Sequence, residues 1–360
     1  MKTVELFAGI GGFRIAADKC NLKTIWANDI NENAVKVYKN NYGENSIIKG
    51  DINDLINEIP DHDLLTGGFP CQPFSKAGKK LGIQDYRGTL FESIVNILSL
   101  KKPEYFILEN VNSLLYMNNG NNFKTILNAL VKQGYKIEWC VFNAMNFELP
   151  QHRLRVIIVG SKNSKPTDSY FYDLFEKKEN TMKWAELLDK KGKFKTWGMA
   201  YKDKYVNENF KTTPKNKIKK IKDILEDNPD KKFDFTEDTL KRIKNSIHVN
   251  KYNNGVQILY NQKGGSRMGY SIFGINGLAP TLTASTSRHY ERYKIGNTFR
   301  RLTNIEYARI QGFPDSFKFF YNYVNDGYKM IGNAVPVNLA YEIACSIKQA
   351  LEGRNREQSK

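Results

Sequence analysis

The chain has 360 residues, 41% of them hydrophobic, which is enough for one large domain plus a smaller domain or a long insertion. Its formal net charge of +17 is compatible with a polyanionic partner such as nucleic acid, although a general lysine bias would give the same charge. No apolar run is long enough to span a bilayer and the start "MKTVELFAGIGG" is unlike a secretion signal, so we expect a cytoplasmic protein that avoids membranes.

The four cysteines, Cys20, Cys71, Cys140 and Cys345, lie far apart and form no C-x-x-C pair. We therefore expect neither a zinc site nor a disulfide framework. In a reducing compartment a cysteine in a polar loop is a candidate nucleophile, but most free cysteines are buried and inert. Composition alone leaves the role of each cysteine open.

Short apolar runs alternate with helical patterns up to residue 160. The apolar runs predict strands at residues 3–7, 24–28, 46–50, 63–67, 104–110 and 155–160. Helical periodicity predicts helices between some of them, at residues 32–41 and 89–100. The alternation is typical of an α/β fold with a parallel, doubly wound sheet, in which ligands bind beyond the carboxyl ends of the strands.

The pattern becomes irregular after residue 160, which indicates a separate, smaller and more variable module. Within it, residues 214–227 predict a basic amphipathic helix. Helical patterns return at residues 303–311 and 336–352, and the last helix is expected to pack back on the first domain.

A glycine-rich turn, "FAGIGG" (residues 7–12), follows the first predicted strand, but its spacing is not the dinucleotide fingerprint G-x-G-x-x-G. Asp29 ends the second strand and Asp51 follows the third. Carboxylates at these places can accept hydrogen bonds from ribose hydroxyls and reach an adenine amino group. The pattern suits a nucleoside cofactor without a bound pyrophosphate, with helix capping as the alternative for each aspartate.

Cys71 lies in "GGFPCQPFS", directly after the fourth predicted strand and therefore at the same sheet edge. The flanking prolines restrict the backbone and can aim the thiol. The loop that follows is basic and spaced by glycines, which predicts a lid that closes over phosphates, with an ordinary surface loop as the alternative. Its candidate DNA-binding residues are Ser75, Lys76, Lys79, Lys80 and Arg87.

Glu109, in "ENV", ends the fifth strand at this edge. A cysteine and a carboxylic acid that face one pocket indicate nucleophilic attack coupled to proton donation. Arg153 and Arg155, in "QHRLR", are two residues apart, so on a strand their side chains share a face. The two guanidinium groups suit an anionic or carbonyl-bearing ligand, or a structural ion pair.

These motifs occur together in a recognisable order: "FAGIGG", "GGFPCQPFS" with "RGTLF", "FILENV", "QHRLR", "RLTNIEYARIQGFP" and "GNAVPVNLA". The set resembles the DNA (cytosine-5)-methyltransferase family over about residues 4–160 and 300–352. The resemblance implies a Rossmann-like methyltransferase sheet with a smaller, irregular target-recognition domain. The implied division is residues 1–165 for catalysis and cofactor binding, 166–299 for target recognition, 300–330 as a connecting segment and 331–360 returning to the catalytic domain.

The resemblance also implies a mechanism. Cys71 would add to carbon 6 of a flipped-out cytosine, Glu109 would hold ring nitrogen 3, and Arg155 with Arg153 would bind the carbonyl oxygen and the adjacent backbone. A methyl group would then pass from S-adenosyl-L-methionine to carbon 5, and no metal is required.

The cofactor contacts that the resemblance implies include two departures from the family pattern. Asp29 stands where the family commonly has glutamate, and Ile30 stands where it often has an aromatic residue, which weakens the expected stacking on adenine. The implied cofactor-binding residues are Phe7, Gly9, Gly11, Gly12, Asp29, Ile30, Asp51, Ile52, Pro70, Leu90, Asn333 and Val335.

The expected substrate is a short, specific site in double-stranded DNA. With no long regulatory extension, the chain is expected to be a prokaryotic, monomeric restriction-modification enzyme. Its cognate endonuclease is expected to act on the same site without a stable complex. Two alternatives remain: a tRNA cytosine-5 methyltransferase, and a non-catalytic DNA-binding protein on the same scaffold. The size of the module at residues 161–299 argues against the first, and the intact Cys71, Glu109, Arg153 and Arg155 argue against the second.

Overall fold

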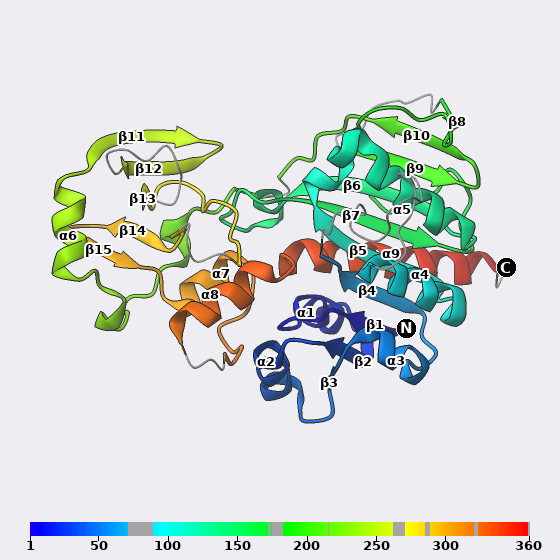
Figure 1. Cartoon of the computed structure of the whole chain (residues 1–360), viewed down its shortest axis with the longest axis horizontal. Helices are drawn as coiled ribbons and strands as arrows, with labels where there is room; N and C mark the ends of the chain where they lie inside the picture. The colour runs from blue at the N-terminus through cyan, green and yellow to red at the C-terminus, as the bar shows by residue number, and fades with distance from the viewer. Residues whose placement is uncertain are drawn as a thin grey trace, which may run out of the picture.

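The computed structural model describes residues 1–70, 89–171, 174, 183–214, 216–261, 271–284, 289–319 and 323–358. Figure 1 shows a larger lobe built on one sheet, a smaller lobe built on a second sheet, and two short helices between them. Within the described ranges, no helix is both long and apolar enough to cross a bilayer. The predicted nucleophile and lid residues lie outside the described residues; they are Cys71, Ser75, Lys76, Lys79, Lys80 and Arg87.

The larger lobe contains a ten-stranded sheet in the order β3-β2-β1-β4-β5-β7-β6-β9-β10-β8. Its strands are β1 (Lys2–Leu6), β2 (Lys23–Asp29), β3 (Ile48–Lys49), β4 (Leu64–Gly68), β5 (Tyr105–Val111), β6 (Lys136–Asn143), β7 (Leu154–Ser161), β8 (Ala185–Glu186), β9 (Trp197–Tyr201) and β10 (Lys204–Glu208). The predicted Rossmann-like α/β fold is confirmed.

The direction of the strands differs from the prediction in one half of the sheet. Strands β1 to β5 pair in parallel, but β7 runs antiparallel to both β5 and β6. The expectation of a wholly parallel sheet is therefore wrong beyond β5. The reason is the short connection between β6 and β7, since parallel neighbours need a crossover of a dozen or more residues.

Side chains of the central strands alternate between two apolar cores. Phe106 and Leu108 of β5 pack on the face covered by α4 (Leu90–Lys101) and α5 (Asn121–Lys132). Tyr105 and Ile107 point to the opposite face, where α1 (Gly12–Lys19) and α9 (Val337–Gln358) pack. The period of two explains why the run "YFIL" is apolar throughout, because both faces of the strand are buried. The remaining helices of this lobe are α2 (Glu32–Tyr42) and the short α3 (Ile52–Leu55).

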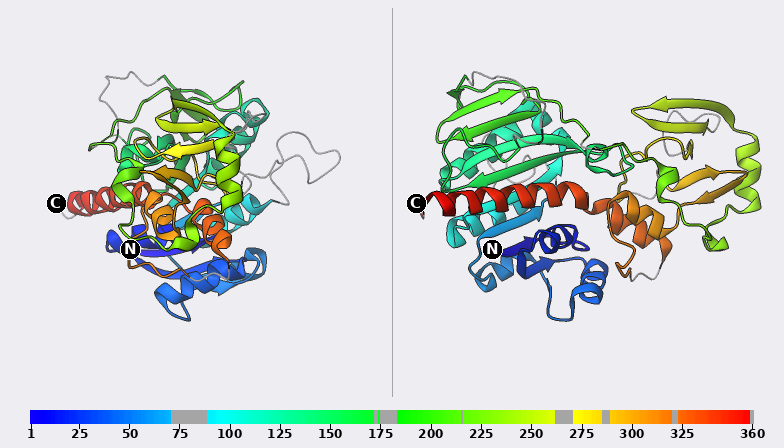
Figure 2. Two further views of the ribbon diagram at one scale, coloured as in Figure 1. Left: turned by 90° about the vertical axis from the view of Figure 1, so that its left-hand side faces the viewer. Right: turned by 180° about the vertical axis from the view of Figure 1, so that it is seen from behind.

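The smaller lobe contains a five-stranded sheet in the order β11-β12-β13-β14-β15. Its elements are α6 (Glu237–Lys244), β11 (Ile247–Asn253), β12 (Val256–Asn261), β13 (Ser271–Gly274), β14 (Arg292–Ile295) and β15 (Thr298–Arg301). Helices α7 (Asn304–Ile310) and α8 (Val324–Asn333) follow and lie between the lobes, as the views in Figures 1 and 2 agree. Arg300 of β15 joins this sheet to α7 through two buried hydrogen bonds to Glu306, of 2.7 and 2.6 Å.

Two predictions for the region after residue 160 are wrong. Residues 185–208, which fall within the predicted target-recognition domain, add β8, β9 and β10 to the large sheet. Across the described residues 214 and 216–227, the one helical element is a 3₁₀ turn at Ile221–Ile224, where an amphipathic helix was predicted. The backbone N–H groups of Ile221 and Lys222 donate to the carbonyl oxygens of Gly277 and Ile275, so tertiary pairing replaces the helical hydrogen bonds. The rest of the domain division stays a prediction.

The expectation of no disulfide is also wrong for one pair of cysteines. Cys20, which ends α1, and Cys345 of α9 form a disulfide bond. Their Cα atoms are 5.7 Å apart although the residues are separated by 325 positions in the sequence. A pairing across this distance cannot be read from spacing, since it depends on α9 packing against α1.

We expect reduction of this disulfide to destabilise the protein. A bond that closes a long loop restricts the unfolded chain, and such bonds typically contribute about 2–4 kcal/mol. The free energy of unfolding of the oxidised wild type should therefore fall in dithiothreitol, whereas Cys345→Ser should be weaker from the start and insensitive to reductant. Equal urea midpoints for oxidised and reduced wild type would contradict the expectation.

Candidate active site

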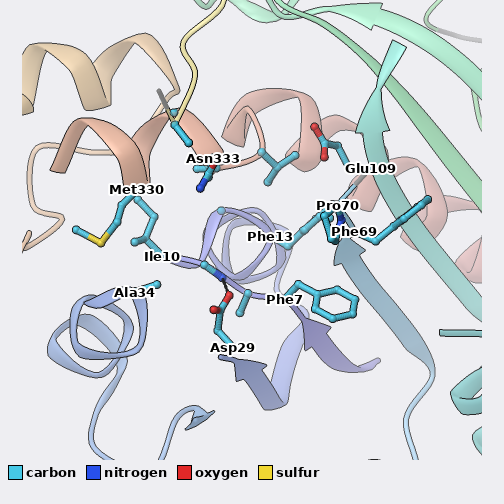
Figure 3. A pocket seen from close by; sticks show the side chains of 18 of the residues that line it. Phe7, Ile10, Phe13, Asp29, Ala34, Phe69, Pro70, Glu109, Met330 and Asn333 are labelled. Carbon is cyan, nitrogen blue, oxygen red and sulfur yellow. Dashed lines mark hydrogen bonds between the residues drawn. The ribbon is translucent and has the colours of Figure 1, made fainter. Parts of the chain in front are cut away.

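A cavity of about 600 Å³ lies beyond the carboxyl ends of β1, β2, β4 and β5. Its lining joins residues from the start of the chain to residues 282–284 and 329–335, which lie far away in the sequence. Figure 3 shows Asp29 and Glu109 entering it from different strands, with Met330 and Asn333 on another side. Segments that are distant in the sequence therefore line the cavity together.

Asp29 fixes the turn that follows β1. Its carboxylate accepts hydrogen bonds from the backbone N–H groups of Gly9 and Asn31, each at 2.7 Å. Burial raises the pKa of Asp29, while these two donors act in the opposite direction. Gly9 has a φ of 56°, a left-handed conformation that favours glycine. A carboxylate has about four lone-pair sites, so Asp29 keeps acceptor capacity for a ligand.

The first residue of α1 packs directly against the far end of the chain. A Cβ atom added to Gly12 would lie 2.7 Å from Cγ1 of Val335, so this contact requires glycine. Val335 and Asn333 line the same cavity as Gly12. The glycine-rich turn "FAGIGG" thus packs closely against "GNAV", and its small residues also leave room for a ligand.

Glu109 and Arg155 form an ion pair at the edge of the cavity. Arg155 Nε lies 2.6 Å from Glu109 Oε1, and the two side chains are only 10% and 13% exposed. Glu109 Oε2 lies on the side of Gly68, where an added Cβ would approach it to 3.3 Å. The arrangement presents a partly desolvated carboxyl and a fixed cation to the same space, which suits recognition of a polar ring edge.

Arg153 lies deeper than Arg155. Its guanidinium is 1% exposed and donates to the carbonyl oxygens of Leu282 at 2.6 Å, Gly332 at 3.0 Å and Ala334 at 3.1 Å. Burial lowers the pKa of Arg153, and the neighbouring Arg155 acts in the same direction. The carbonyl oxygens thus supply polar contacts to both terminal nitrogens of the buried cation, while Nε has no hydrogen-bond partner among the described residues.

A comparison with known protein families decides the identity of this site. The model of the family described as C-5 cytosine-specific DNA methylase matches residues 1–349. The chain belongs to this family. It is therefore a DNA (cytosine-5)-methyltransferase, as the order of motifs predicted.

Curated relatives of this methyltransferase match over nearly their whole length. It is 35% identical to "Type II methyltransferase M.HaeII" of Haemophilus aegyptius, covering 99% of this chain and 95% of the relative. It is 30% identical to "Type II methyltransferase M.HhaI" of Haemophilus parahaemolyticus, covering 98% and 95%. Among solved structures, S. pombe Dnmt2 methyltransferase has a TM-score of 0.67 at 20% identity, covering 97% of this chain and 99% of that one, which shows a shared fold.

The cavity of the methyltransferase gathers ten of the fifteen predicted site residues that lie in the described part of the chain. The predicted residues in its lining are Phe7, Gly9, Gly12, Asp29, Pro70, Glu109, Arg153, Arg155, Asn333 and Val335. Pro70, which lines the cavity, is the last described residue before the predicted nucleophile Cys71 in the sequence.

Other predicted cofactor residues lie outside this lining. Asp51 caps α3 by accepting a hydrogen bond of 2.9 Å from the Asn53 backbone, which is the alternative that the sequence left open. Ile52 is 2% exposed in the apolar core, and Ile30 is 67% exposed. Gly11 and Leu90 are also absent from the lining as the described residues form it. The contacts of these residues with the adenine end of the cofactor stay a prediction.

Sequence reasoning missed two titratable residues of the cavity lining, Lys329 of α8 and the buried Glu5 of β1. Its carboxyl group accepts hydrogen bonds from the Tyr38 hydroxyl at 2.9 Å and from the Arg14 backbone at 3.2 Å. Burial raises the pKa of Glu5 to about 8, although both contacts act in the opposite direction. The only sequence signal was an acidic residue inside the apolar strand "TVELF".

The raised pKa of Glu5 predicts a loss of stability as the pH rises. Between the ordinary value of 4.5 and about 8, only the unfolded chain ionises, so the free energy of unfolding should fall by up to about 1.4 kcal/mol per pH unit. Glu5→Gln should remove this contribution and give a flatter profile in urea unfolding at pH 5, 6.5 and 8. Parallel profiles for the two proteins would show that Glu5 ionises as readily in the folded state.

Proposed function

We propose that the protein transfers a methyl group from S-adenosyl-L-methionine to carbon 5 of a cytosine within a short, specific site in duplex DNA. The observation that carries the proposal is the Glu109–Arg155 ion pair, which faces the same cavity as Asp29 and as Pro70, the residue that precedes Cys71 in the sequence. A base and a nucleoside cofactor need such a shared space, because the methyl group passes directly between them.

The cavity suits S-adenosyl-L-methionine in size and chemistry. Its volume of about 600 Å³ lies in the range of small-molecule sites. Asp29 would accept hydrogen bonds from the ribose hydroxyls, and Phe7, Ile10 and Met330 would supply apolar contacts. The cofactor supplies an electrophilic methyl group. Asp51, Ile52 and Ile30, which lie outside the lining, would contact the adenine end of the cofactor.

The residues of the chain would do the remaining chemistry on the cytosine. The Cys71 thiolate would form a bond to carbon 6, while Glu109 favours protonation at ring nitrogen 3 and Arg155 holds the carbonyl oxygen. The electron pair displaced toward carbon 5 makes that carbon nucleophilic. After methylation, loss of the carbon-5 proton to a base would expel the thiolate, and return of the nitrogen-3 proton to Glu109 would restore the neutral aromatic ring.

The cytosine must leave the duplex to reach this site, which costs a few kcal/mol. Phosphate contacts from a chain with a net charge of +17 can offset that cost. We assign target recognition to the smaller lobe, which lies beside the mouth of the cavity through residues 282–284. The predicted lid would add contacts from Ser75, Lys76, Lys79, Lys80 and Arg87.

We further infer a role in restriction-modification, because the matched relatives are named type II methyltransferases. The enzyme would act as a cytoplasmic monomer and protect host DNA at the site that a cognate endonuclease cuts. That endonuclease would recognise the same sequence without forming a stable complex with this chain.

The deciding experiment offers duplex DNA and tRNA separately with S-adenosylmethionine labelled in its methyl group. We expect label in DNA only, and bisulfite sequencing of DNA from expressing cells should then show one methylated sequence context. Label in tRNA alone would replace the proposal with a tRNA methyltransferase, and absence of label from both would favour a non-catalytic binding protein.

A further inference from the structure

We propose that Arg153 is a positioning residue that clamps the two distant segments of the cavity wall together, and that it does not contact the substrate. The inference rests on the proposed use of this cavity for the cofactor. It changes the expectation that Arg153 and Arg155, two residues apart on one strand, bind the cytosine side by side.

The first observation is the set of groups that Arg153 contacts. Its Nη1 atom donates to Leu282, in the segment that leads out of the smaller lobe. Its Nη2 atom donates to Gly332 and Ala334, at the end of α8. Arg153 directly precedes β7 and is 1% exposed, so its guanidinium joins the start of β7 to both segments and leaves little surface for a ligand. Among the described residues, only its Nε atom lacks a hydrogen-bond partner.

The second observation is a pair of buried glutamines that bind the same segments. Gln151 accepts from the Leu282 backbone N–H at 3.1 Å and donates to the side chain of Gln311 at 3.1 Å. Gln311 donates in turn to the carbonyl oxygens of Ile331 at 3.0 Å and Ala334 at 3.2 Å. Both glutamine side chains are fully buried. Arg153 and Gln311 therefore share one acceptor, the carbonyl oxygen of Ala334.

The clamped segments form a wall of the cavity. Thr283 and Ala284 follow Leu282 in the lining, and Asn333 and Val335 flank Ala334. The two segments also touch, since a Cβ atom on Gly332 would lie 2.5 Å from the carbonyl oxygen of Thr283. A small shift of either backbone would thus change the wall that faces the "FAGIGG" turn. Arg155, by contrast, is held by Glu109 and not by this wall.

The test compares Arg153→Met, Arg153→Lys and Arg155→Met. Methionine removes the donors, whereas lysine restores up to three of them at one point. We expect Arg153→Met to raise the KM for S-adenosylmethionine about tenfold or more, with a smaller change in kcat, because a charge-assisted contact is lost from the wall. Lysine should recover part of the loss. Arg155→Met should instead lower kcat with little change in that KM.

Hydrogen–deuterium exchange of the unliganded proteins gives a readout that needs no methyl transfer. Arg153→Met should speed exchange in residues 279–284 and 331–335, and Arg155→Met should leave both segments as in the wild type. Should Arg153→Met fail to fold, Gln311→Leu, which removes the other donor to Ala334, should show the same pattern.

Two results would overturn the inference. One is unchanged exchange in Arg153→Met with a fall in kcat equal to that of Arg155→Met, which would make Arg153 a substrate contact. The other is wild-type exchange and wild-type KM in both Arg153→Met and Gln311→Leu. Failure of the proposed methyl transfer itself would appear separately, as wild-type protein without activity but with the expected exchange pattern in the variants.

Discussion

Cys71→Ser should abolish methyl transfer, with a fall in rate of more than about 10⁴-fold. The attacking species is a thiolate, and even a free cysteine is only a few per cent thiolate at pH 7. A serine hydroxyl is far less acidic and cannot supply a comparable nucleophile without a dedicated base. The measurement is single-turnover transfer of labelled methyl groups to duplex DNA that contains the target site.

A covalent trap separates loss of the nucleophile from loss of binding. In DNA with 5-fluorocytosine at the target position, carbon 5 carries no proton that can leave, so the wild-type enzyme should remain bonded to the DNA in denaturing gels. Cys71→Ser should bind this DNA without forming the bond. Transfer by Cys71→Ser at the wild-type rate would show that Cys71 is not the nucleophile.

Cys140 provides the matched control. It lies within β6 and is fully buried, and burial raises the pKa of its thiol well above the ordinary value. It is therefore unsuited to attack a base, and Cys140→Ala should retain both methyl transfer and the covalent trap. Loss of the trap in a folded Cys140→Ala protein would argue against Cys71 as the sole nucleophile.

Periodicity predicted the half of the fold that positions the site. Strands β1, β2, β4 and β5 have strong apolar signals. Because they are parallel, their carboxyl ends meet at one edge of the sheet. Asp29 and Glu109 could be placed together for this reason. The reversed direction of β7 was invisible, because an apolar run has the same pattern in a parallel and an antiparallel sheet.

Contacts between distant segments could not be predicted. The three acceptors of Arg153 lie more than a hundred positions away in the sequence, and two arginines on one strand face gave no sign that one of them serves the backbone. Asp51 shows a second kind of ambiguity. An aspartate before a short helix fits both a helix-capping and a cofactor-binding role, and the sequence does not distinguish them. In both cases the packing partner decides the role, and local sequence does not contain it.

Glu109→Gln should lower kcat by roughly 10²–10⁴-fold, which is the usual contribution of a positioned proton donor. Glutamine keeps the shape and one carbonyl oxygen, but it cannot deliver a proton to ring nitrogen 3 and it leaves the partly buried Arg155 without a counter-charge. The KM for S-adenosylmethionine should change little, because Asp29 and the "FAGIGG" turn form a different part of the cavity. Steady-state kinetics with duplex DNA provide the measurement.

The double variant Glu109→Gln/Arg155→Met tests whether the pair acts as a unit. If Arg155 works chiefly by holding both Glu109 and the base, the double variant should be less impaired than the product of the two single effects, because the second change removes an interaction that is already broken. Glu208→Gln is the surface control, since its ion pair with Lys195 is about half exposed and such pairs contribute little. A Glu109→Gln enzyme with the wild-type kcat would leave the carboxyl group without a catalytic role, and the ion pair would then be structural.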